Sequence, residues 1–529
     1  MSSRRLAPFV AVMLAGVLLV SCTGGSETGT AETGTDDIDG TTTSTAPAVE
    51  PIELRPLHVE EQRIVDDEGR EVLLRGANVN ALGEYARADP QVAPTAPVTD
   101  DDWEAMAANG FSVVRLLMSW SRLEPVPDRI DQGYLDEIEA AVTAANEHGI
   151  YVVLDMHQDA WGMSSATLEG TTCPPGTEPA IGWDGAPAWA TITDGATTCR
   201  APGSGRESAP AVQRAFANFY ADTDGISGHL TAVWAAVAER FTGDAGVAGY
   251  DLLNEPNGVE PGAANQVAYS RWLQSTIRAI RDVESAAGAP PVPMFVEPLQ
   301  LYPLPFNALL PEHLDDDQLV FAAHNYAESI QSILTLEQTF DIYEAGADEL
   351  DAALWIGEYG FWDLDPDTLE VAARYAAEED RRLLGGAWWQ WRQTCGDPHS
   401  VAGPGAPATE DQIHLITRAC PGHDDEANDR DAHVTGEFLS ILGRAYPRAA
   451  PGHLTELESD PASGHLRVRG TDAAVGPELV VWLPDRGDAT PLAPTTTEGL
   501  DEVELLDVPG GRRLTATATQ SDWHLVVDG

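Results

Sequence analysis

The sequence predicts an α/β fold, a (β/α)8 TIM barrel followed by a C-terminal antiparallel β-sandwich domain. Within residues 51–448, eight short runs of strand-forming apolar residues alternate with helical stretches, a pattern typical of a barrel of parallel strands. Each run carries polar or aromatic residues toward its carboxyl end, where barrel strands hold their functional side chains. Over residues 449–529 the pattern changes to short strands separated by turns, which favours a β-sandwich.

Each of the eight predicted strands consists mainly of apolar residues and carries a polar or aromatic side chain toward its carboxyl end. They span residues 72–78, 112–117, 151–157, 247–254, 294–297, 319–326, 354–358 and 386–391. The side chains at or near their ends are Asn78, Arg115, His157, Asn254, Glu297, His324, Glu358 and Trp391. One such residue alone is more often a structural polar group. Eight in phase predict a single rim that carries an active site.

The amino terminus has the pattern of an export signal. Arg4 and Arg5 precede an apolar run over residues 6–20, which is shorter than a membrane span. The run ends in Leu19-Val20-Ser21-Cys22, which looks like a lipobox, so residues 1–22 are interpreted as a lipoprotein signal peptide with Cys22 lipidated. An ordinary signal peptide is the alternative. Residues 23–50 are rich in Ser, Thr, Gly and Asp and predict a disordered tether.

We therefore expect an exported protein, either a cell-surface lipoprotein held at the membrane by its N-terminal lipid or a secreted one, and a monomer. Beyond Cys22 the chain has four cysteines, and in an exported protein these predict two disulfides. Sequence proximity favours Cys173–Cys199 and Cys395–Cys420 among the three possible connectivities. The spacing is not that of a zinc site. The first pair lies in a long insertion, residues 160–210, of a length that usually covers a site.

The charge of the chain excludes several function classes. The formal net charge is −55, and the sequence contains arginine but no lysine. Nucleic acid is excluded as a partner because phosphate binding needs a basic surface, and lysine Schiff-base chemistry is excluded as well. An acidic surface without lysine is typical of adaptation to high salt. A genome composition that depletes lysine codons would give the same pattern.

Two glutamates predict the reaction. Glu255 and Glu358 each follow a run of buried-strand character and precede turn residues, so both should face the mouth of the barrel. Two carboxyls facing one cleft are the minimum needed to hydrolyse a glycosidic bond. The sequence context assigns Glu255 as the acid/base and Glu358 as the nucleophile, with the Asn254 amide beside a sugar hydroxyl. The plainer alternative is that both are loop acids in an acidic chain.

Further side chains fit the same chemistry. Arg115 would keep Glu358 ionised by charge pairing, and His324 and Tyr326 would orient it. A core histidine is the plain alternative for His324. Trp389 and Trp391 lie on one face of a strand by alternation, and Trp391, nearer the rim, is the expected sugar platform. Barrel packing remains the alternative for one of these tryptophans.

These motifs resemble a known enzyme family. The segments that carry the resemblance are Arg75-Gly76-Ala77-Asn78, Val114-Arg115, His157-Gln158-Asp159, Asn254-Glu255-Pro256, His324-Asn325-Tyr326, Glu358 and Trp391. Together they look like clan-A retaining glycosidases of glycoside hydrolase family 5. Leu154-Asp155-Met156-His157-Gln158-Asp159, followed by a tryptophan-bearing loop and later by a β-sandwich, is similar to the endoglycoceramidases of that family.

The resemblance implies cleavage of the bond between a glycan and ceramide, without cofactor or metal. It also implies that His157, Asp159 and Gln300 bind sugar hydroxyls. The family has a lysine near the first strand that contacts sugar, and this chain lacks it, so the preferred glycan is left open. Two other functions remain open: a β-glucosidase or endo-glucanase acting on non-lipid glycans, and a non-catalytic carbohydrate-binding lipoprotein.

Overall fold

The structure is a computed structural model of the chain. It describes residues 52–86, 93–180, 182, 184–257, 263–300, 302–303, 310–329, 333–360, 366–394, 397, 416–418, 436–487 and 491–529. The predicted signal peptide, the predicted lipidation site Cys22, the predicted tether and the predicted Cys395–Cys420 disulfide all lie outside these residues.

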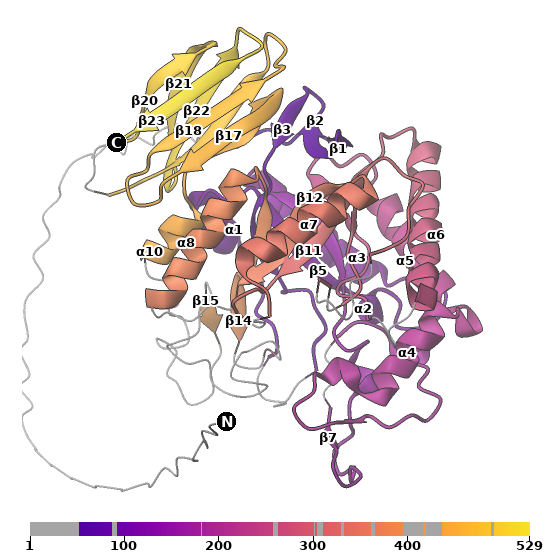
Figure 1. The fold of residues 1–529 in the computed structure, drawn as a ribbon. Helices are drawn as coiled ribbons and strands as arrows, with labels where there is room; N and C mark the ends of the chain where they lie inside the picture. The colour runs from indigo at the N-terminus through magenta and orange to yellow at the C-terminus, as the bar shows by residue number, and fades with distance from the viewer. Residues whose placement is uncertain are drawn as a thin grey trace, which may run out of the picture. The chain divides into compact units, whose positions relative to one another are not determined.

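Eight parallel strands close into a barrel, which confirms the predicted fold class (Figure 1). In chain order they are β4 (Arg75–Val79), β5 (Val113–Ser119), β6 (Tyr151–His157), β9 (Val247–Asp251), β10 (Met294–Val296), β11 (Leu319–Asn325), β12 (Ala353–Gly360) and β13 (Gly386–Trp389). Each strand pairs in parallel with its neighbours in that order, and β13 closes the ring on β4. All carboxyl ends therefore meet at one rim.

Helices follow the strands and cover the outside of the barrel (Figure 1). They are α1 (Asp100–Ala108), α2 (Trp120–Leu123), α3 (Gln132–Glu147), α4 (Pro210–Tyr220), α5 (Ile226–Phe241), α6 (Ala263–Ala287), α7 (Leu336–Leu350), α8 (Pro366–Arg381) and α10 (Gly436–Leu442). Their apolar faces and the outward side chains of the strands form the largest core cluster. Among the helices of the described residues, none is long and apolar enough to cross a membrane.

Alternation along the strands sorts side chains between this outer core and the barrel interior. On β5, Val114 and Leu116 belong to the outer core, while Val113 packs inside with residues of the other strands. Arg115 and Leu117 therefore point inward above Val113. The lower interior is filled by apolar groups, among them Phe295 and Trp355, whose rings lie 5.3 Å apart. Arg115, which lies above these apolar groups, is consequently buried beneath the rim of the barrel.

A β-bulge sets the direction of Glu358. The register between β11 and β12 pairs Ala323 with Ile356 and then His324 with Glu358, so β12 contains one extra residue there. The bulge turns Glu358 toward the interior, where strict alternation would have placed its neighbour Gly357. A Cβ at position 357 would lie 3.0 Å from the Nε2 of His324. Glycine thus leaves room for the imidazole that sits against Glu358.

The second half of the fold is a β-sandwich that includes the start of the described chain. One sheet has the order β1-β2-β3-β16-β19-β22-β21, and the other has the order β17-β18-β23-β20. These strands are β1 (Leu57–Glu60), β2 (Arg63–Asp66), β3 (Arg70–Val72), β16 (Tyr446–Pro451), β17 (His453–Ser459), β18 (Leu466–Thr471), β19 (Glu478–Pro484), β20 (Ala493–Glu498), β21 (Leu500–Val508), β22 (Gly511–Ala518) and β23 (Trp523–Asp528).

The sandwich sheet alters two sequence-based boundaries. The predicted first barrel strand began at residue 72, but Val72 pairs with Ala449 of β16, and the barrel strand begins at Arg75. The predicted junction between residues 448 and 449 falls inside β16. Strands β1–β3 therefore join the sheet formed by the C-terminal strands, and the chain enters the barrel from the sandwich.

Two short strand pairs lie in the long connections. In the insertion after β6, β7 (Glu178–Pro179) pairs with β8 (Cys199–Arg200), and the Cys173–Cys199 disulfide favoured by the sequence closes the same region. Four short 3-10 helices occur between β6 and α5: η1 (Met163–Ser165), η2 (Ala188–Ala190), η3 (Arg206–Ser208) and η4 (Thr223–Gly225). After β13, β14 (Arg392–Thr394) pairs in parallel with β15 (Ile416–Arg418).

Candidate active site

Arg115 is the centre of the site. Its side chain is fully buried, and its guanidinium lies 2.8–2.9 Å from carboxylate oxygens of four residues: Asp155, Asp251, Glu297 and Glu358. It also donates to the side-chain oxygens of Asn78 and Asn254 at 3.2 and 2.9 Å. A fixed fork of donors suits this many acceptors. Arg115 projects from β5 into the barrel interior. Its hydrogen bonds and ion pairs link β5 to β4, β6, β9 and β12 and to the residue that follows β10.

Glu358 is held by two donors. Arg115 donates to its Oε1 at 2.8 Å, and the Tyr326 hydroxyl donates to its Oε2 at 2.7 Å. Only 6% of the Glu358 side chain is exposed. Burial raises the pKa of the Glu358 carboxyl above its usual value, and the positive charges of His324 and Arg115 oppose that rise. The two donors fix the orientation of the carboxyl group.

Glu255 lies on the loop that follows β9, in a left-handed backbone conformation with φ +38°. Its amide donates to Glu297 Oε2 at 2.7 Å, so a buried carboxylate secures this turn. Its side chain is 28% exposed, and its Oε1 lies 3.0 Å from His324 Nδ1. One carboxyl oxygen of Glu255, one of Glu358 and a nitrogen of His324 all lie within 4.8 Å of one another. The two predicted catalytic glutamates therefore face the same small space.

His324 governs the protonation of this group. Its pKa is raised well above the usual value, because Glu297, Glu358 and the hydrogen bond to Glu255 outweigh the effect of burial. Burial also raises the pKa of the Glu255 carboxyl, but the hydrogen bond and the charge of His324 lower it by more, so the net pKa lies below the usual value. The two opposite shifts favour a protonated His324 beside an ionised Glu255.

The other predicted polar residues continue the site along β6. His157 Nδ1 lies 2.7 Å from Asp155 Oδ2, and His157 Nε2 lies 3.4 Å from Asp159 Oδ2 and 3.5 Å from the amide nitrogen of Asn254. Trp389 stacks on His157 with ring centroids 5.5 Å apart. These groups line one side of the barrel mouth next to the two glutamates.

The structure places Trp391 away from this site. Its indole N–H donates to Asp102 of α1 at 3.0 Å, and its ring packs edge-on against Phe111 in the outer core. The expectation that Trp391 is the sugar platform is therefore wrong, since β13 ends at Trp389 and strand alternation does not extend beyond it. Trp389, which clusters with Tyr326 and Tyr85, is the tryptophan that borders the site.

Gln300 lies near the site through its backbone. Its amide donates to the carbonyl of Pro256 at 2.7 Å, one residue beyond Glu255. The loop after β10 is thus attached to the loop that carries the predicted acid/base. That Gln300 binds a sugar hydroxyl stays a prediction.

The sequence analysis missed two buried carboxyls. Asp155 and Asp251 are fully buried inside the barrel and bind Arg115 directly. Burial and the nearby carboxylates of Glu297 and Asp155 raise the pKa of Asp251 well above its usual value, despite Arg115. The sequence could have indicated both residues, because an aspartate within the apolar run of a buried strand needs a buried partner.

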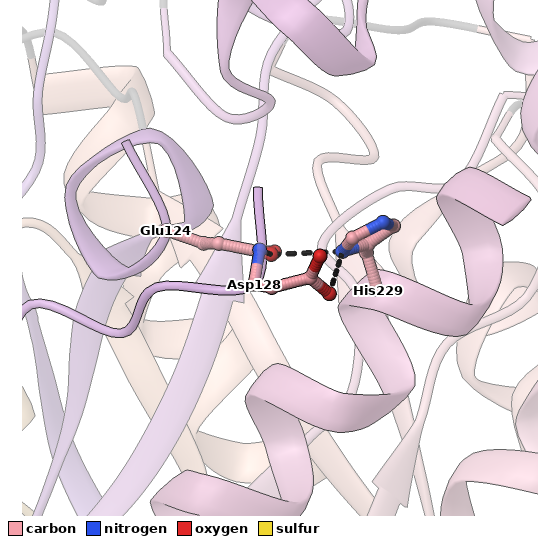
Figure 2. Close-up of side chains that lie close together, drawn as sticks. All are labelled: Glu124, Asp128 and His229. Atoms are coloured by element: carbon pink, nitrogen blue, oxygen red, sulfur yellow. Dashed lines mark hydrogen bonds and ion pairs between the residues drawn. The ribbon is translucent and has the colours of Figure 1, made fainter. Parts of the chain in front are cut away.

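Three groups of His, Asp and Glu side chains in the described part of the chain are close enough to hold a metal ion. They are His157–Asp159–Asp184, Glu255–His324–Glu358 and Glu124–Asp128–His229. The first two belong to the barrel site. In the third, His229 Nδ1 lies 2.8 Å from Glu124 and 3.7 Å from Asp128 (Figure 2). Glu124 also accepts from the Trp120 indole, so these contacts form a hydrogen-bonded link between α5 and the end of α2.

Comparison with known proteins agrees with this geometry. The family model described as Cellulase (glycosyl hydrolase family 5) matches residues 65–394, which include all eight barrel strands. The chain belongs to glycosyl hydrolase family 5. It is accordingly a glycoside hydrolase, and its catalytic domain is the barrel.

Relatives of this family 5 hydrolase include enzymes named for glycolipids. Endoglycoceramidase I of Rhodococcus hoagii (strain 103S) is 25% identical over 497 residues, covering 88% of this chain and 86% of the relative. The crystal structure of an endogalactoceramidase is 40% identical with a TM-score of 0.81, covering 90% of this chain and all of that one. Endo-glycoceramidase II from Rhodococcus sp., solved as a lactosyl-enzyme intermediate, is 26% identical with a TM-score of 0.66, covering 90% and 99% of the two chains.

Proposed function

We propose that this family 5 hydrolase cleaves the β-glycosidic bond between a glycan and ceramide with retention of configuration. The observation that carries the proposal is the approach of the Glu255 and Glu358 carboxyl oxygens to within 4.8 Å. Retaining enzymes hold their carboxyls about 5 Å apart, whereas inverting enzymes leave about 6.5–9.5 Å for a water molecule. The glycolipid substrate is supported by the names of the relatives.

In the first step, Glu358 attacks the anomeric carbon and Glu255 protonates the leaving oxygen. A covalent glycosyl-enzyme forms, and the aglycone departs with the proton. Arg115 and Tyr326 orient the Glu358 carboxyl, and the charge of Arg115 favours its ionised form. In the second step, Glu255 removes a proton from water, which attacks the same carbon and releases Glu358. We infer that Asn254 and His157 bind hydroxyls of the sugar.

His324 supplies the proton for the first step. Its Nδ1 lies 3.0 Å from Glu255 Oε1 and its raised pKa favours the protonated imidazole, whereas the leaving group must be protonated by a carboxylic acid. We infer that the proton passes from His324 Nδ1 to Glu255 as the leaving oxygen takes it up. The pair then returns to its starting state when Glu255 deprotonates the incoming water.

The choice of sugar and of lipid in the proposed substrate is supported by one solved structure and by the sequence. The endogalactoceramidase is the more similar of the solved structures described above, at 40% identity, so a galactosyl residue linked directly to ceramide is the preferred candidate. The chain has no lysine, so the sugar contact made by lysine elsewhere in the family must come from another group. The signal sequence further supports export, with Cys22 lipidation keeping the enzyme near membrane substrates.

The test is product analysis on a panel of galactosyl- and glucosyl-linked glycosphingolipids and a soluble β-glucan. Release of ceramide together with an intact glycan is expected, and proton NMR of early product should show the β-anomer. Glu358→Gln should abolish turnover while leaving the thermal unfolding midpoint near that of the wild type. Cleavage of the glucan without ceramide release would favour the non-lipid alternative, and an α-anomeric first product would contradict retention.

A further inference from the structure

We propose that Arg206 and Glu207 on the insertion after β6 form one wall of the glycan-binding pocket and hydrogen-bond to sugar hydroxyls. This inference rests on the proposed function, in that it takes the region beside Asp159 as the glycan side of the site. In this view the insertion helps to decide which glycan is accepted. The Cys173–Cys199 disulfide keeps the two residues in place.

The insertion is tied down shortly before these residues. The disulfide joins Cys199 of β8 to Cys173, and Arg200 forms an ion pair with Glu178 of β7 at 2.8 Å. Thr167 spans the same region, because its hydroxyl donates to the carbonyl of Thr198 at 3.0 Å. The chain then turns into η3, which begins at Arg206. The position of η3 is thus limited by a covalent cross-link a short distance away in sequence.

Arg206 contacts the established site directly. Its guanidinium forms a close ion pair with Asp159, whose other oxygen lies 3.4 Å from His157. It also pairs with Glu207 through Nε at 2.9 Å. The Arg206 side chain is 22% exposed, while Asp159 is almost completely covered. The accessible part of this ion pair is therefore the arginine, supplied by the insertion.

The insertion also fixes the loop that carries the acid/base. The backbone carbonyl of Glu207 accepts from the Asn257 side chain at 3.1 Å and from Gln213 at 2.7 Å. Gln213 in turn donates to the Asn257 side-chain oxygen at 3.1 Å. Because Asn257 lies two residues after Glu255, η3 borders the catalytic loop as well as Asp159. Burial lowers the pKa of Arg206, but the carboxylates of Asp159 and Glu207, with a smaller contribution from Glu255, raise it by more.

The chemistry of the pair suits a sugar. A guanidinium offers several fixed donors and a carboxylate offers acceptors, so adjacent hydroxyls of one sugar ring can be bound as donor and acceptor at the same time. Hydrogen bonds to charged groups are stronger than those between neutral groups. The reacting carbon does not need these contacts, so they should act equally on the ground state and the transition state. Such binding lowers KM without changing kcat.

The test compares Arg206→Gln and Glu207→Gln with the matched control Arg214→Gln. Arg214 lies on α4 after the insertion, is 54% exposed, and reaches its nearest carboxylate, on Asp194, only at 3.5 Å. We expect Arg206→Gln to raise KM about tenfold, the effect of one lost charge-assisted hydrogen bond, with kcat little changed. The affinity of the released oligosaccharide for the Glu358→Gln protein should fall by the same factor on adding Arg206→Gln. The control should match the wild type in both measurements.

A double-mutant cycle that combines removal of the disulfide with Arg206→Gln tests the role of the disulfide. Cys173→Ser with Cys199→Ser should also raise KM, and adding Arg206→Gln should produce little further increase, because both changes disturb the same contact. Additive effects would show that the disulfide does not act through Arg206. Unchanged KM and oligosaccharide affinity in Arg206→Gln, or a loss confined to kcat, would overturn the inference.

The outcome is separable from that of the proposed function. If the wild-type enzyme cleaves a soluble glycan and spares glycolipids, the same KM and affinity comparison on that glycan still supports or contradicts a role for Arg206. If the wild-type enzyme releases ceramide and Arg206→Gln behaves identically, the proposed function stands and this inference fails.

Discussion

The imidazole of His324 lies between the two glutamates of the site, with Nδ1 3.0 Å from Glu255 and 3.4 Å from Glu358. Its Nε2 lies 3.2 Å from Glu297. One ring thus contacts both the predicted acid/base and the predicted nucleophile, and its positive charge favours the ionised form of each.

Replacing His324 by Gln should move the alkaline limb of the kcat/KM pH profile to lower pH. In the wild type the Glu255–His324 pair keeps its proton up to the raised pKa of His324. In the variant only the Glu255 carboxyl can hold that proton, and it loses it at lower pH. Rates measured over a wide pH range with a soluble aryl glycoside provide the check. An alkaline limb that does not move would show that the His324 proton is not used.

Tyr326→Phe provides a matched contrast at Glu358. The phenol donates to Glu358 Oε2 at 2.7 Å. Loss of a donor to the ionised form raises the pKa of Glu358. The acidic limb of the pH profile should therefore move to higher pH while the alkaline limb stays in place. A shift of the alkaline limb would contradict the separate roles of the two glutamates.

Glu255→Ala should lose most activity on glycolipids and much less on substrates with good leaving groups. Only protonation of the leaving oxygen is removed in the first step, and a dinitrophenyl glycoside does not need it. Added azide should then speed turnover and give the β-glycosyl azide. In Glu358→Ala, azide should instead give the α-glycosyl azide, since it replaces the enzyme nucleophile. The anomeric configuration of each product, read by NMR, decides the assignment.

The two tryptophans at the end of β13 should separate function from stability. Trp389→Phe should lower kcat/KM with little change in the free energy of unfolding, because its ring borders the site and stacks on His157. Trp391→Phe should leave kcat/KM near the wild-type value and cost about 1–3 kcal/mol of stability, because a buried hydrogen bond to Asp102 is lost. Kinetics and urea unfolding of both variants test this. The reverse pattern would restore Trp391 as the platform.

The sequence predicted the parts of the site that depend on strand periodicity. Arg115 and Glu358 were recognised because polar side chains stood at the carboxyl ends of apolar runs, and these ends converge in any closed parallel barrel. Trp391 was misplaced for a related reason, since period-two alternation was carried past the point where the strand stops. The start of the first barrel strand was placed too early, because an apolar run does not reveal that Val72 pairs with Ala449 of a distant strand.

The remaining parts of the site depend on contacts that have no local signature. The bulge that turns Glu358 inward lies where His324 packs over Gly357. Arg206 reaches Asp159 through an irregular insertion whose path is set by a cross-link. Long-range packing rather than periodicity fixes both, so a single sequence could indicate that the insertion had a role but not which residue performed it.

Glu71 should make stability depend on pH outside the active site. It is buried on β3 of the sandwich, next to Leu454 of β17, and burial raises its pKa from 4.5 to about 7 despite its hydrogen bond from Leu454. The folded state holds the Glu71 proton more tightly than the unfolded state. The contribution of this proton to the free energy of unfolding is therefore complete below pH 4.5 and is lost as pH rises toward 7. Linkage sets the loss at about 3 kcal/mol.

Glu71→Gln tests this linkage, since the amide keeps an acceptor for Leu454 and does not titrate. Denaturant unfolding of both proteins between pH 5 and pH 8 should show the variant gaining stability relative to the wild type as pH rises. Parallel stability curves would contradict the raised pKa of Glu71.

Sodium chloride should raise the thermal unfolding midpoint of the whole enzyme. The chain has a formal net charge of −55, and salt screens repulsion between exposed carboxylates over about 10 Å at 0.1 M. Buried ion pairs, such as that between Arg115 and Glu358, are screened far less. The stability lost from weaker attraction in these pairs should therefore be smaller than the stability gained from weaker repulsion between surface carboxylates. Sucrose at equal osmolality serves as the control for general exclusion effects. A midpoint that rises more with salt than with sucrose supports adaptation to high salt, whereas a flat salt profile leaves genome composition as the reason for the missing lysines.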